Sequence, residues 1–152
     1  MVITIFEGDA GLLRHLGEAW EREHNGQDFG IKTDINVFLS EIARLVNDGL
    51  SDVLVMHDKE KIVGLLGITA FQNPIGRGLI ASEHFWYVLP DYRGLTSVRM
   101  VKAAENWAKN RGCTHLIMNA SLLASPLYHR VIELYKVFGM REFETSFIKK
   151  LE

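Results

Sequence analysis

Apolar residues recur at two different spacings along this chain, and the two spacings occur in separate blocks. A spacing of three or four residues is typical of amphipathic helices, whereas alternation or a short apolar run is typical of strands. Read in this way, the sequence predicts a strand, two helices, three strands, a helix, a strand, a helix and a closing strand. This order indicates an α/β fold with a mixed sheet.

Turn and capping residues set the expected ends of the elements in the first half of the chain. Asp9 can cap the first helix, and either Thr33 or Asp34 can cap the second, with Gly49 just past its end. The apolar arms of residues 53–71 flank a polar Asp-Lys-Glu-Lys tip, which predicts an antiparallel β-hairpin.

The stretch from Glu83 to Gly112 is the most informative part of the sequence. It reads as an apolar strand, a Pro-Asp-Tyr-Arg-Gly turn and an amphipathic helix that ends at glycine. The predicted core face of this helix carries Met100, Val101, Ala104, Trp107 and Ala108. A helix that begins directly after a strand presents unpaired N–H groups and the positive end of its dipole. This geometry suits an anion, such as the diphosphate of a nucleotide cofactor.

The last third of the chain repeats the alternation of strand and helix. Residues 113–120 read as a short buried strand. Ser125 and Pro126 can serve as the cap and first residue of a helix that should end at Gly139. The chain finishes with residues 143–151, which we expect to form a closing strand.

Length and composition describe an ordinary globular protein. The chain has 152 residues, of which 47% are hydrophobic and 24% charged, and no linker-like segment divides it, so residues 1–152 are expected to form one domain. The formal net charge of -2 argues against nucleic acid as a main partner. No apolar run approaches the roughly 18 residues of a membrane span, and the N-terminus lacks the features of a signal peptide. We therefore expect a cytoplasmic protein without a membrane partner.

Cysteine and histidine give little chemistry. The single cysteine, Cys113, cannot form an internal disulfide, and its apolar neighbours favour a buried strand thiol over a nucleophile. The histidines show no spacing that is typical of metal ligands, so no metal site is expected.

Two segments resemble the GNAT superfamily of acetyl-CoA-dependent N-acetyltransferases. One is Phe-Trp-Tyr-Val-Leu-Pro-Asp-Tyr-Arg-Gly followed by a helix, and the other is Leu-Tyr-Lys-Val-Phe-Gly-Met. With the order of elements, the resemblance covers nearly the whole chain. It implies a mixed sheet of six to seven strands, about four helices on both faces and a splayed strand pair at the cofactor site. It also implies acetyl transfer from acetyl-CoA to a primary amine of a small molecule or peptide, by direct attack in a ternary complex.

The resemblance assigns cofactor contacts to the end of the strand, the turn and the helix start. The N–H of Val88 would polarise the thioester carbonyl, the amides from Gly94 onward would bind the diphosphate, and Asn119 would touch the pantetheine or the acceptor. The candidate cofactor-binding residues are Val88, Arg93, Gly94, Leu95, Thr96, Ser97, Val98, Arg99 and Asn119. Thr96 or Ser97 can cap the helix. The loop is poor in glycine, however, and the side chains of Leu95 and Thr96 can crowd the ligand.

Acetyl transfer also needs a base for the amine and an acid for the departing thiolate. Tyr135 matches the tyrosine that commonly serves as the acid in this family, with Tyr128 as the fallback. For the base we consider Glu83, which alternation places on the same side as Phe85 and Tyr87, and His84, which it places on the opposite side. We take Glu83 as the candidate base; His84 or a water chain is the alternative.

Other readings stay open at this point. The glycine-poor loop is compatible with a catalytically inactive acyl-CoA-binding or protein-interaction module of the same fold. Exposed strand edges would also allow a homodimer. The acceptor pocket is expected between the first two helices and the loops at residues 27–32 and 141–145, whose mixed charges favour no class of amine.

Overall fold

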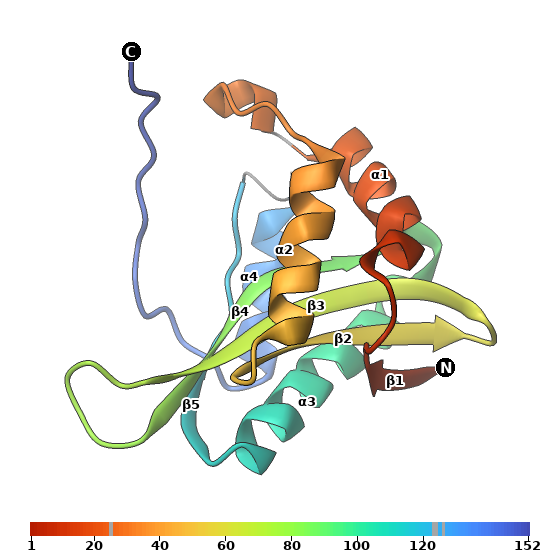
Figure 1. Cartoon of the computed structure of the whole chain (residues 1–152). Coiled ribbons are helices and arrows are strands. Elements are labelled where there is room, and N and C mark those ends of the chain that lie inside the picture. Colours follow the sequence, from red (N-terminus) through yellow and green to blue (C-terminus); the bar gives the residue numbers. More distant parts are fainter. Residues whose placement is uncertain (25, 123–124, 126) are drawn as a thin grey trace.

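The computed structural model describes residues 1–24, 26–122, 125 and 127–152, and these form a twisted sheet with helices on both faces (Figure 1). The strands are β1 (Val2–Ile5), β2 (Ser51–Asp58), β3 (Lys61–Gln72), β4 (Leu79–Val88) and β5 (Cys113–Ile117). The α-helices are α1 (Arg14–Glu23), α2 (Ile35–Asn47), α3 (Leu95–Asn110) and α4 (Tyr128–Val137). Short 3-10 turns lie at Ala10–Leu13, Gly26–Phe29 and Pro90–Tyr92.

The strands follow their order in the sequence, β1-β2-β3-β4-β5. The first four are antiparallel, and β5 is parallel to β4 because α3 connects them as a crossover. None of the helices in the described residues is long and apolar enough to cross a membrane.

Two apolar cores lie on the two faces of the sheet. The core on the α3 face contains Met100, Ala104, Trp107 and Ala108 of α3. Val101, the fifth residue predicted for this face, is buried but lies outside the cluster. The core on the other face is formed mainly by leucines of α1 and α2 against β2, β3 and β4. Its buried residues include Leu13, Leu16, Leu39, Ile42, Leu45, Val53, Val55 and Leu65. The predicted buried face of α3 is thus confirmed.

The sheet has five strands among the described residues, so the expectation of six to seven is wrong. Residues 143–151 do not form the predicted closing strand. They are extended away from the body in Figure 1, and Phe143 and Phe147 are exposed. No strand among the described residues pairs with this segment, and a strand needs a partner for its backbone groups.

The helix starts agree with the sequence in part. The Asp34 carboxylate accepts hydrogen bonds from the N–H groups of the first turn of α2, so Asp34 is the cap rather than Thr33. Gly94 precedes α3 as its N-cap, which corrects the assignment to Thr96 or Ser97. Before α4, the Ser125 hydroxyl accepts from the Leu127 N–H at 3.0 Å. Pro126 lies outside the described residues.

A β-bulge in β4 changes the faces of its polar residues. Phe85 pairs with Gly67 of β3 and Glu83 with Ile68, so His84 has no opposite residue. As a result, His84 lies on the α2 face with Phe85, and Glu83 lies on the α3 face. The simple alternation that placed Glu83 beside Phe85 is therefore wrong.

The far end of α3 is fixed to β2. Asp52 accepts hydrogen bonds from Trp107 Nε1 at 2.8 Å and from Arg111 Nη2 at 2.5 Å. Arg111 also donates to the Gly49 carbonyl at 3.0 Å. These contacts hold α3 against the sheet, with its N-terminus directed at the end of β4.

Candidate active site

The candidate site lies where β4 and β5 separate. Their pairing ends at Ser82 and Ile117, so the second half of β4 continues without β5 beside it. The Leu89 N–H donates to the Val63 carbonyl at 2.9 Å. Because N–H directions alternate along a strand, the Val88 N–H points away from β3, toward the gap that β5 has left.

Glu83 is a buried carboxylate at this gap, with 6% of its surface exposed. Its Oε2 accepts hydrogen bonds from the backbone N–H of Asn119 at 2.9 Å and from Asn119 Nδ2 at 3.3 Å. Asn119 Nδ2 also donates to the Glu83 carbonyl at 2.9 Å. Burial raises the pKa of Glu83 to about 7, although the bonds from Asn119 oppose the shift. The carboxyl group can therefore gain or lose a proton near neutral pH.

Tyr135 of α4 joins the same cluster. Its hydroxyl donates to the Asn119 carbonyl at 2.9 Å, and its ring stacks on Trp86 with centroids 6.2 Å apart. Burial, reinforced by the Glu83 carboxylate, raises the pKa of Tyr135, so the phenol keeps its proton. Tyr128, the fallback, begins α4, and its ring lies tilted against that of His129 with centroids 4.0 Å apart. The structure thus brings Glu83, Asn119 and Tyr135 together and leaves Tyr128 outside their contacts.

Two buried polar atoms at the end of β4 have no hydrogen-bond partner within the described part of the chain. They are Trp86 Nε1 and the Tyr87 hydroxyl. Burial and the nearby Glu23 carboxylate raise the pKa of Tyr87 to about 12. Trp86 faces α4, and Tyr87 packs in the core under α1. Unpaired donors on both faces are consistent with a site that binds ligands at this end of β4.

The start of α3 supplies amides for an anion. Gly94 has φ +96°, a conformation that favours glycine, and no heavy atom lies within 4 Å of the position a Cβ would occupy. No side chain caps the helix, so the first-turn amides have no partner from a cap. Leu95 is 88% exposed, so its side chain extends into solvent and leaves the helix start open. Uncapped amides with no side chain over them are compatible with an anion such as a diphosphate.

The two arginines near this turn have other contacts. Arg93 Nη2 pairs with Glu23 of α1 at 2.5 Å, its Nε donates to the Val88 carbonyl at 2.9 Å, and its guanidinium lies over the Tyr87 ring. Arg93 therefore joins α1 to the end of β4 and does not point along the turn.

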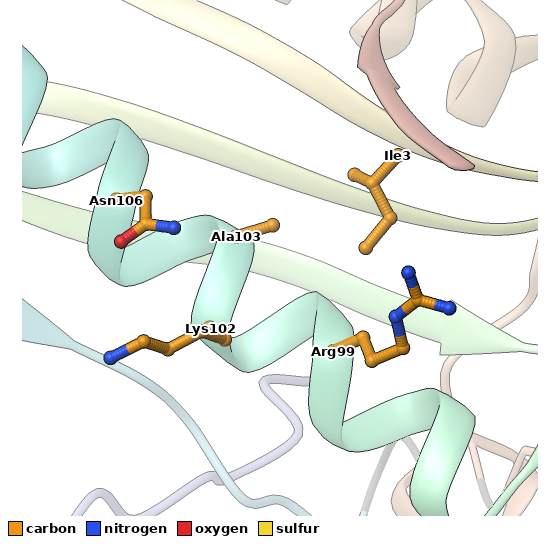
Figure 2. Close-up of a pocket in the computed structure, with 5 residues that line it drawn as sticks. All are labelled: Ile3, Arg99, Lys102, Ala103 and Asn106. Atoms are coloured by element: carbon orange, nitrogen blue, oxygen red, sulfur yellow. The ribbon is translucent and has the colours of Figure 1, made fainter. Parts of the chain in front are cut away.

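Arg99 lines a shallow hollow of about 230 Å³ on the side of α3 that faces β1. Figure 2 shows Arg99 and Ile3 on opposite sides of this space, with Lys102 and Asn106 further along α3. The hollow shares no lining residue with the cluster of Glu83, so Arg99 is at a distance from the candidate chemistry.

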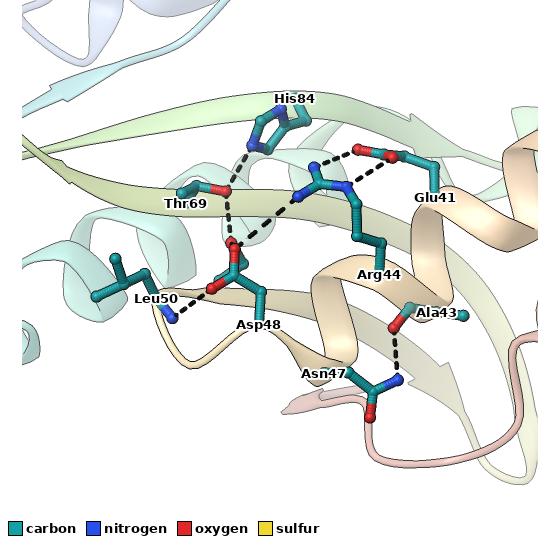
Figure 3. A network of polar contacts seen from close by, with 9 residues as sticks. Glu41, Ala43, Arg44, Asn47, Asp48, Leu50, Thr69 and His84 are labelled. Atoms are coloured by element: carbon teal, nitrogen blue, oxygen red, sulfur yellow. Dashed lines mark hydrogen bonds and ion pairs between the residues drawn. The ribbon is translucent and has the colours of Figure 1, made fainter.

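A polar network that the sequence did not predict lies on the opposite face of β4. Thr69 Oγ1 is 2.5 Å from His84 Nε2 and 2.7 Å from the Ser51 hydroxyl, which donates to Asp48 at 2.9 Å. Figure 3 shows this chain of contacts running from β4 to the C-terminal end of α2, where Arg44 pairs with Asp48 at 3.9 Å. Burial lowers the pKa of His84.

Two features that shape the site were missed from the sequence. The bulge was missed because it depends on the register against β3, which no local pattern of β4 records. The Glu23–Arg93 pair was missed because its members are 70 positions apart. The glycine at position 67, opposite the bulge, is the one local signal, since bulges and strand glycines occur together.

Comparison with known proteins agrees with this architecture. Among solved structures, a transcriptional regulator from Bacillus halodurans C-125 superposes with a TM-score of 0.79 at 17% identity, covering 99% of this chain and 100% of that one. A ribosomal-protein-alanine N-acetyltransferase from Brucella melitensis biovar Abortus 2308 gives 0.75 at 16% identity, with 99% and 100% covered. The aminoglycoside 6'-N-acetyltransferase AAC(6')-IG from Acinetobacter haemolyticus gives 0.69 at 21%, with 100% of both chains covered. At these identities the similarity establishes the fold.

Sequence comparison gives the family. A curated aminoglycoside N(6')-acetyltransferase type 1 from Klebsiella aerogenes is 38% identical over 61 residues, a match that spans 40% of this chain and 40% of the relative. Residues 13–140 match the family model described as the acetyltransferase (GNAT) family. The chain therefore belongs to the GNAT family of acetyltransferases, as its resemblance had implied.

Proposed function

We propose that this protein transfers an acetyl group from acetyl-CoA to a primary amine of a small molecule or peptide, in a ternary complex. The observation that carries the proposal is the contact of two buried side chains, Glu83 and Tyr135, with Asn119 beside the gap between β4 and β5. It combines a carboxyl group with a pKa of about 7 and a phenol that keeps its proton. Perturbed groups that converge in this way are typical of acid–base sites.

The cofactor would lie along this gap. When bound, acetyl-CoA supplies an activated acetyl thioester. The amides at the start of α3 would hold the diphosphate, with Gly94 leaving the approach open. The Val88 N–H, which points toward the gap, would donate to the carbonyl oxygen on which negative charge develops.

Glu83 and Tyr135 would move the protons. An acceptor amine is largely protonated at neutral pH and must lose a proton before it attacks. The Glu83 carboxylate, with its pKa of about 7, would accept that proton directly or through water. The Tyr135 hydroxyl would give its proton to the departing sulfur, which requires it to leave the Asn119 carbonyl to which it donates here.

An aminoglycoside is the first acceptor to test. The curated relative is named for acetylation of an aminoglycoside at the 6' nitrogen, and one structural neighbour is a crystal structure of a 6'-N-acetyltransferase of the same antibiotic class. Another neighbour is named for acetylation of ribosomal-protein alanine, so a peptide with an N-terminal alanine is the second acceptor.

Two measurements test the proposal in order. Acetyl-CoA at 100 times its dissociation constant should stabilise the fold by about 2.7 kcal/mol, which a melting curve detects. Release of the CoA thiol should then depend on an added amine and on Glu83. Glu60→Gln, which removes an exposed carboxylate from the β2–β3 turn, is the matched control. No melting shift with acetyl-CoA would refute the proposal.

A non-catalytic CoA-binding module is the second candidate. Two observations favour it. The Tyr135 hydroxyl already donates its proton to the Asn119 carbonyl, and the loop before α3 contains a single glycine, Gly94. A melting shift with acetyl-CoA, no thiol release with any amine of a broad panel and no effect of Tyr135→Phe would support the module and exclude the enzyme.

A further inference from the structure

The carbonyl of Val88, at the end of β4, faces the gap that β5 leaves. Val88 lies opposite Gly64 of β3, and the Leu89 N–H donates to the Val63 carbonyl at 2.9 Å. In an antiparallel pair the N–H and C=O of one residue point to the same side, so the Val88 carbonyl points away from β3, like its N–H. In a regular sheet the next strand would bind this carbonyl, but the pairing with β5 has already ended at Ser82.

The guanidinium of Arg93 takes the place of the missing strand. Its Nε donates to the Val88 carbonyl at 2.9 Å, and its central carbon lies 5.4 Å from the centroid of the Tyr87 ring. A hydrogen bond from a charged donor is stronger than one from a neutral N–H. One side chain from the turn after β4 therefore holds the last two residues of that strand, on the side where no strand supports them.

Arg93 is itself held from α1. Glu23, the last residue of that helix, accepts a hydrogen bond from Arg93 Nη2 at 2.5 Å. About a third of each of the two side chains is exposed, and an ion pair so open to water contributes little stability by itself. Its effect is on geometry, because a planar guanidinium bound at Nε and Nη2 together has a single orientation. Without the carboxylate, the guanidinium keeps one hydrogen bond and can turn away from the Val88 carbonyl.

We propose that Glu23 is a positioning residue for acetyl transfer: through Arg93 it fixes the backbone of Val88, and with it the direction of the Val88 N–H. The inference rests on the proposed function, in which this N–H donates to the thioester carbonyl as negative charge develops on the oxygen. Such a donor acts only when it is held where the charged oxygen will lie, and a misplacement of about 1 Å can cost about 10²-fold in rate. Glu23 acts on the rate through Arg93, since Arg93 and not Glu23 contacts Val88.

Kinetics of Glu23 variants separate positioning from stability. With acetyl-CoA and an aminoglycoside, or the alanine peptide if that is the accepted amine, Glu23→Ala should lower kcat by ~10–100-fold. The KM for acetyl-CoA should change by less than about threefold, because the amides at the start of α3 are unaltered. Glu23→Gln keeps an oxygen that accepts from Arg93 and should recover most of the rate. Glu41→Ala, which breaks an exposed pair with Arg44 on α2, is the matched control and should leave kcat unchanged. A lower melting temperature of Glu23→Ala with an unchanged kcat would overturn the proposal.

NMR of the Val88 carbonyl gives a second readout that needs no activity. The sequence has valine followed by leucine at two places, Val53-Leu54 and Val88-Leu89. Labelling valine with ¹³C at the carbonyl and leucine with ¹⁵N therefore gives two signals, one from each of these peptide bonds. The Val53 carbonyl accepts from the Phe6 N–H at 2.8 Å in the β1–β2 pair, so its signal is an internal reference.

Loss of a charge-assisted hydrogen bond moves a carbonyl ¹³C signal upfield. Glu23→Ala should therefore shift the Val88 signal upfield and leave the Val53 signal in place. Arg93→Lys should give the same shift, because lysine keeps the charge but has one nitrogen and cannot bind Glu23 and the Val88 carbonyl as the guanidinium does. An unshifted Val88 signal in Glu23→Ala, in a protein that releases thiol, would overturn this proposal alone. A shifted signal with no thiol release from any amine would refute the proposed function, and with it the role of Glu23 in the rate.

Discussion

Glu83 and His84 are neighbours in the sequence, yet they lie in opposite environments. Glu83 is buried on the α3 face, where its carboxylate accepts a hydrogen bond from Asn119, the residue that also binds Tyr135. His84 lies on the α2 face, where the residue keeps more exposure but the ring is partly desolvated beside Thr69. Burial raises the pKa of Glu83 to about 7 and lowers the pKa of His84. The same physical cause moves an acid and a base in opposite directions because burial disfavours the charged form of each.

The difference shows what the bulge does. In a regular strand, Glu83 would share the face of Phe85, against the core under α1 and α2. One extra residue in β4 turns the Glu83 carboxylate toward the gap between β4 and β5 and places His84 on the α2 face. Glu83 gains hydrogen bonds from Asn119, 36 positions away, and Asn119 in turn accepts from Tyr135. His84 instead joins the end of α2 through Thr69 and Ser51.

Replacing Glu83 and His84 in separate variants should give the largest difference, in kcat/KM. Glu83→Gln should lower kcat/KM by ~10²–10⁴-fold, the usual contribution of a general base. His84→Gln keeps a polar group that can reach Thr69 and should leave kcat/KM within about a factor of three, since surface polar changes cost little. Steady-state thiol release with acetyl-CoA and an accepted amine measures both. A larger loss for His84→Gln would assign the base to the other face.

The second-largest effect is expected in how the free energy of unfolding of the parent and of Glu83→Gln depends on pH. The pKa of Glu83 is raised from 4.5 to about 7 by folding, so the folded state binds a proton more tightly than the unfolded state. Its contribution is fully present below pH 4.5 and is lost as the pH rises to about 7, a change on the order of 3 kcal/mol. Urea unfolding at several pH values should show this loss in the parent and not in Glu83→Gln. If the unfolding free energy of Glu83→Gln varied with pH as steeply as that of the parent, the raised pKa of Glu83 would be contradicted.

Tyr135→Phe tests the junction of the cluster. Loss of the hydrogen bond to the Asn119 carbonyl should cost about 1 kcal/mol of stability. If the phenol is the acid, kcat should also fall by at least about tenfold, more than the stability change alone explains. Tyr128→Phe, at the start of the same helix, is the control. Equal rates for Tyr135→Phe and the parent would remove the acid from the mechanism.

The smallest effect is expected on the α2 face. Thr69→Val removes the hydroxyl between His84 and Ser51 and should cost about 0.5–1.5 kcal/mol without changing kcat. Because the pKa of His84 is lowered by folding, its contribution is present at high pH and is lost as the pH falls through the lowered pKa, opposite in sign to that of Glu83. NMR titration of the His84 ring should follow this sign; a pKa above that of a free histidine would contradict it.

The sequence predicted those features that depend on local periodicity. The buried face of α3, the β2–β3 hairpin and the glycine before α3 follow from residues within one element or turn. It predicted the wrong face for Glu83 because register against a neighbouring strand is a non-local property. It also predicted a closing strand at 143–151, which does not form because strand pairing is a non-local property and no strand of the described sheet pairs with these residues.

The candidate site was predicted in composition and not in geometry. Glu83, Asn119 and Tyr135 were each named, but their contact depends on the gap that follows the last β4–β5 pair. Arg93 was assigned to the diphosphate because of its place in the turn, and its pairing with Glu23 could not be read from residues that are so far apart.

Trp86 provides a consequence for experiment. The protein has three tryptophans, and the indole of this one stacks on Tyr135 with its N–H unpaired inside the described structure. An indole in such an apolar setting emits at short wavelength, and a ligand that reaches its nitrogen or displaces Tyr135 will change that emission. With Trp20 and Trp107 replaced by phenylalanine, the intrinsic fluorescence of a single residue becomes an optical gauge of occupancy, free of any coupled assay.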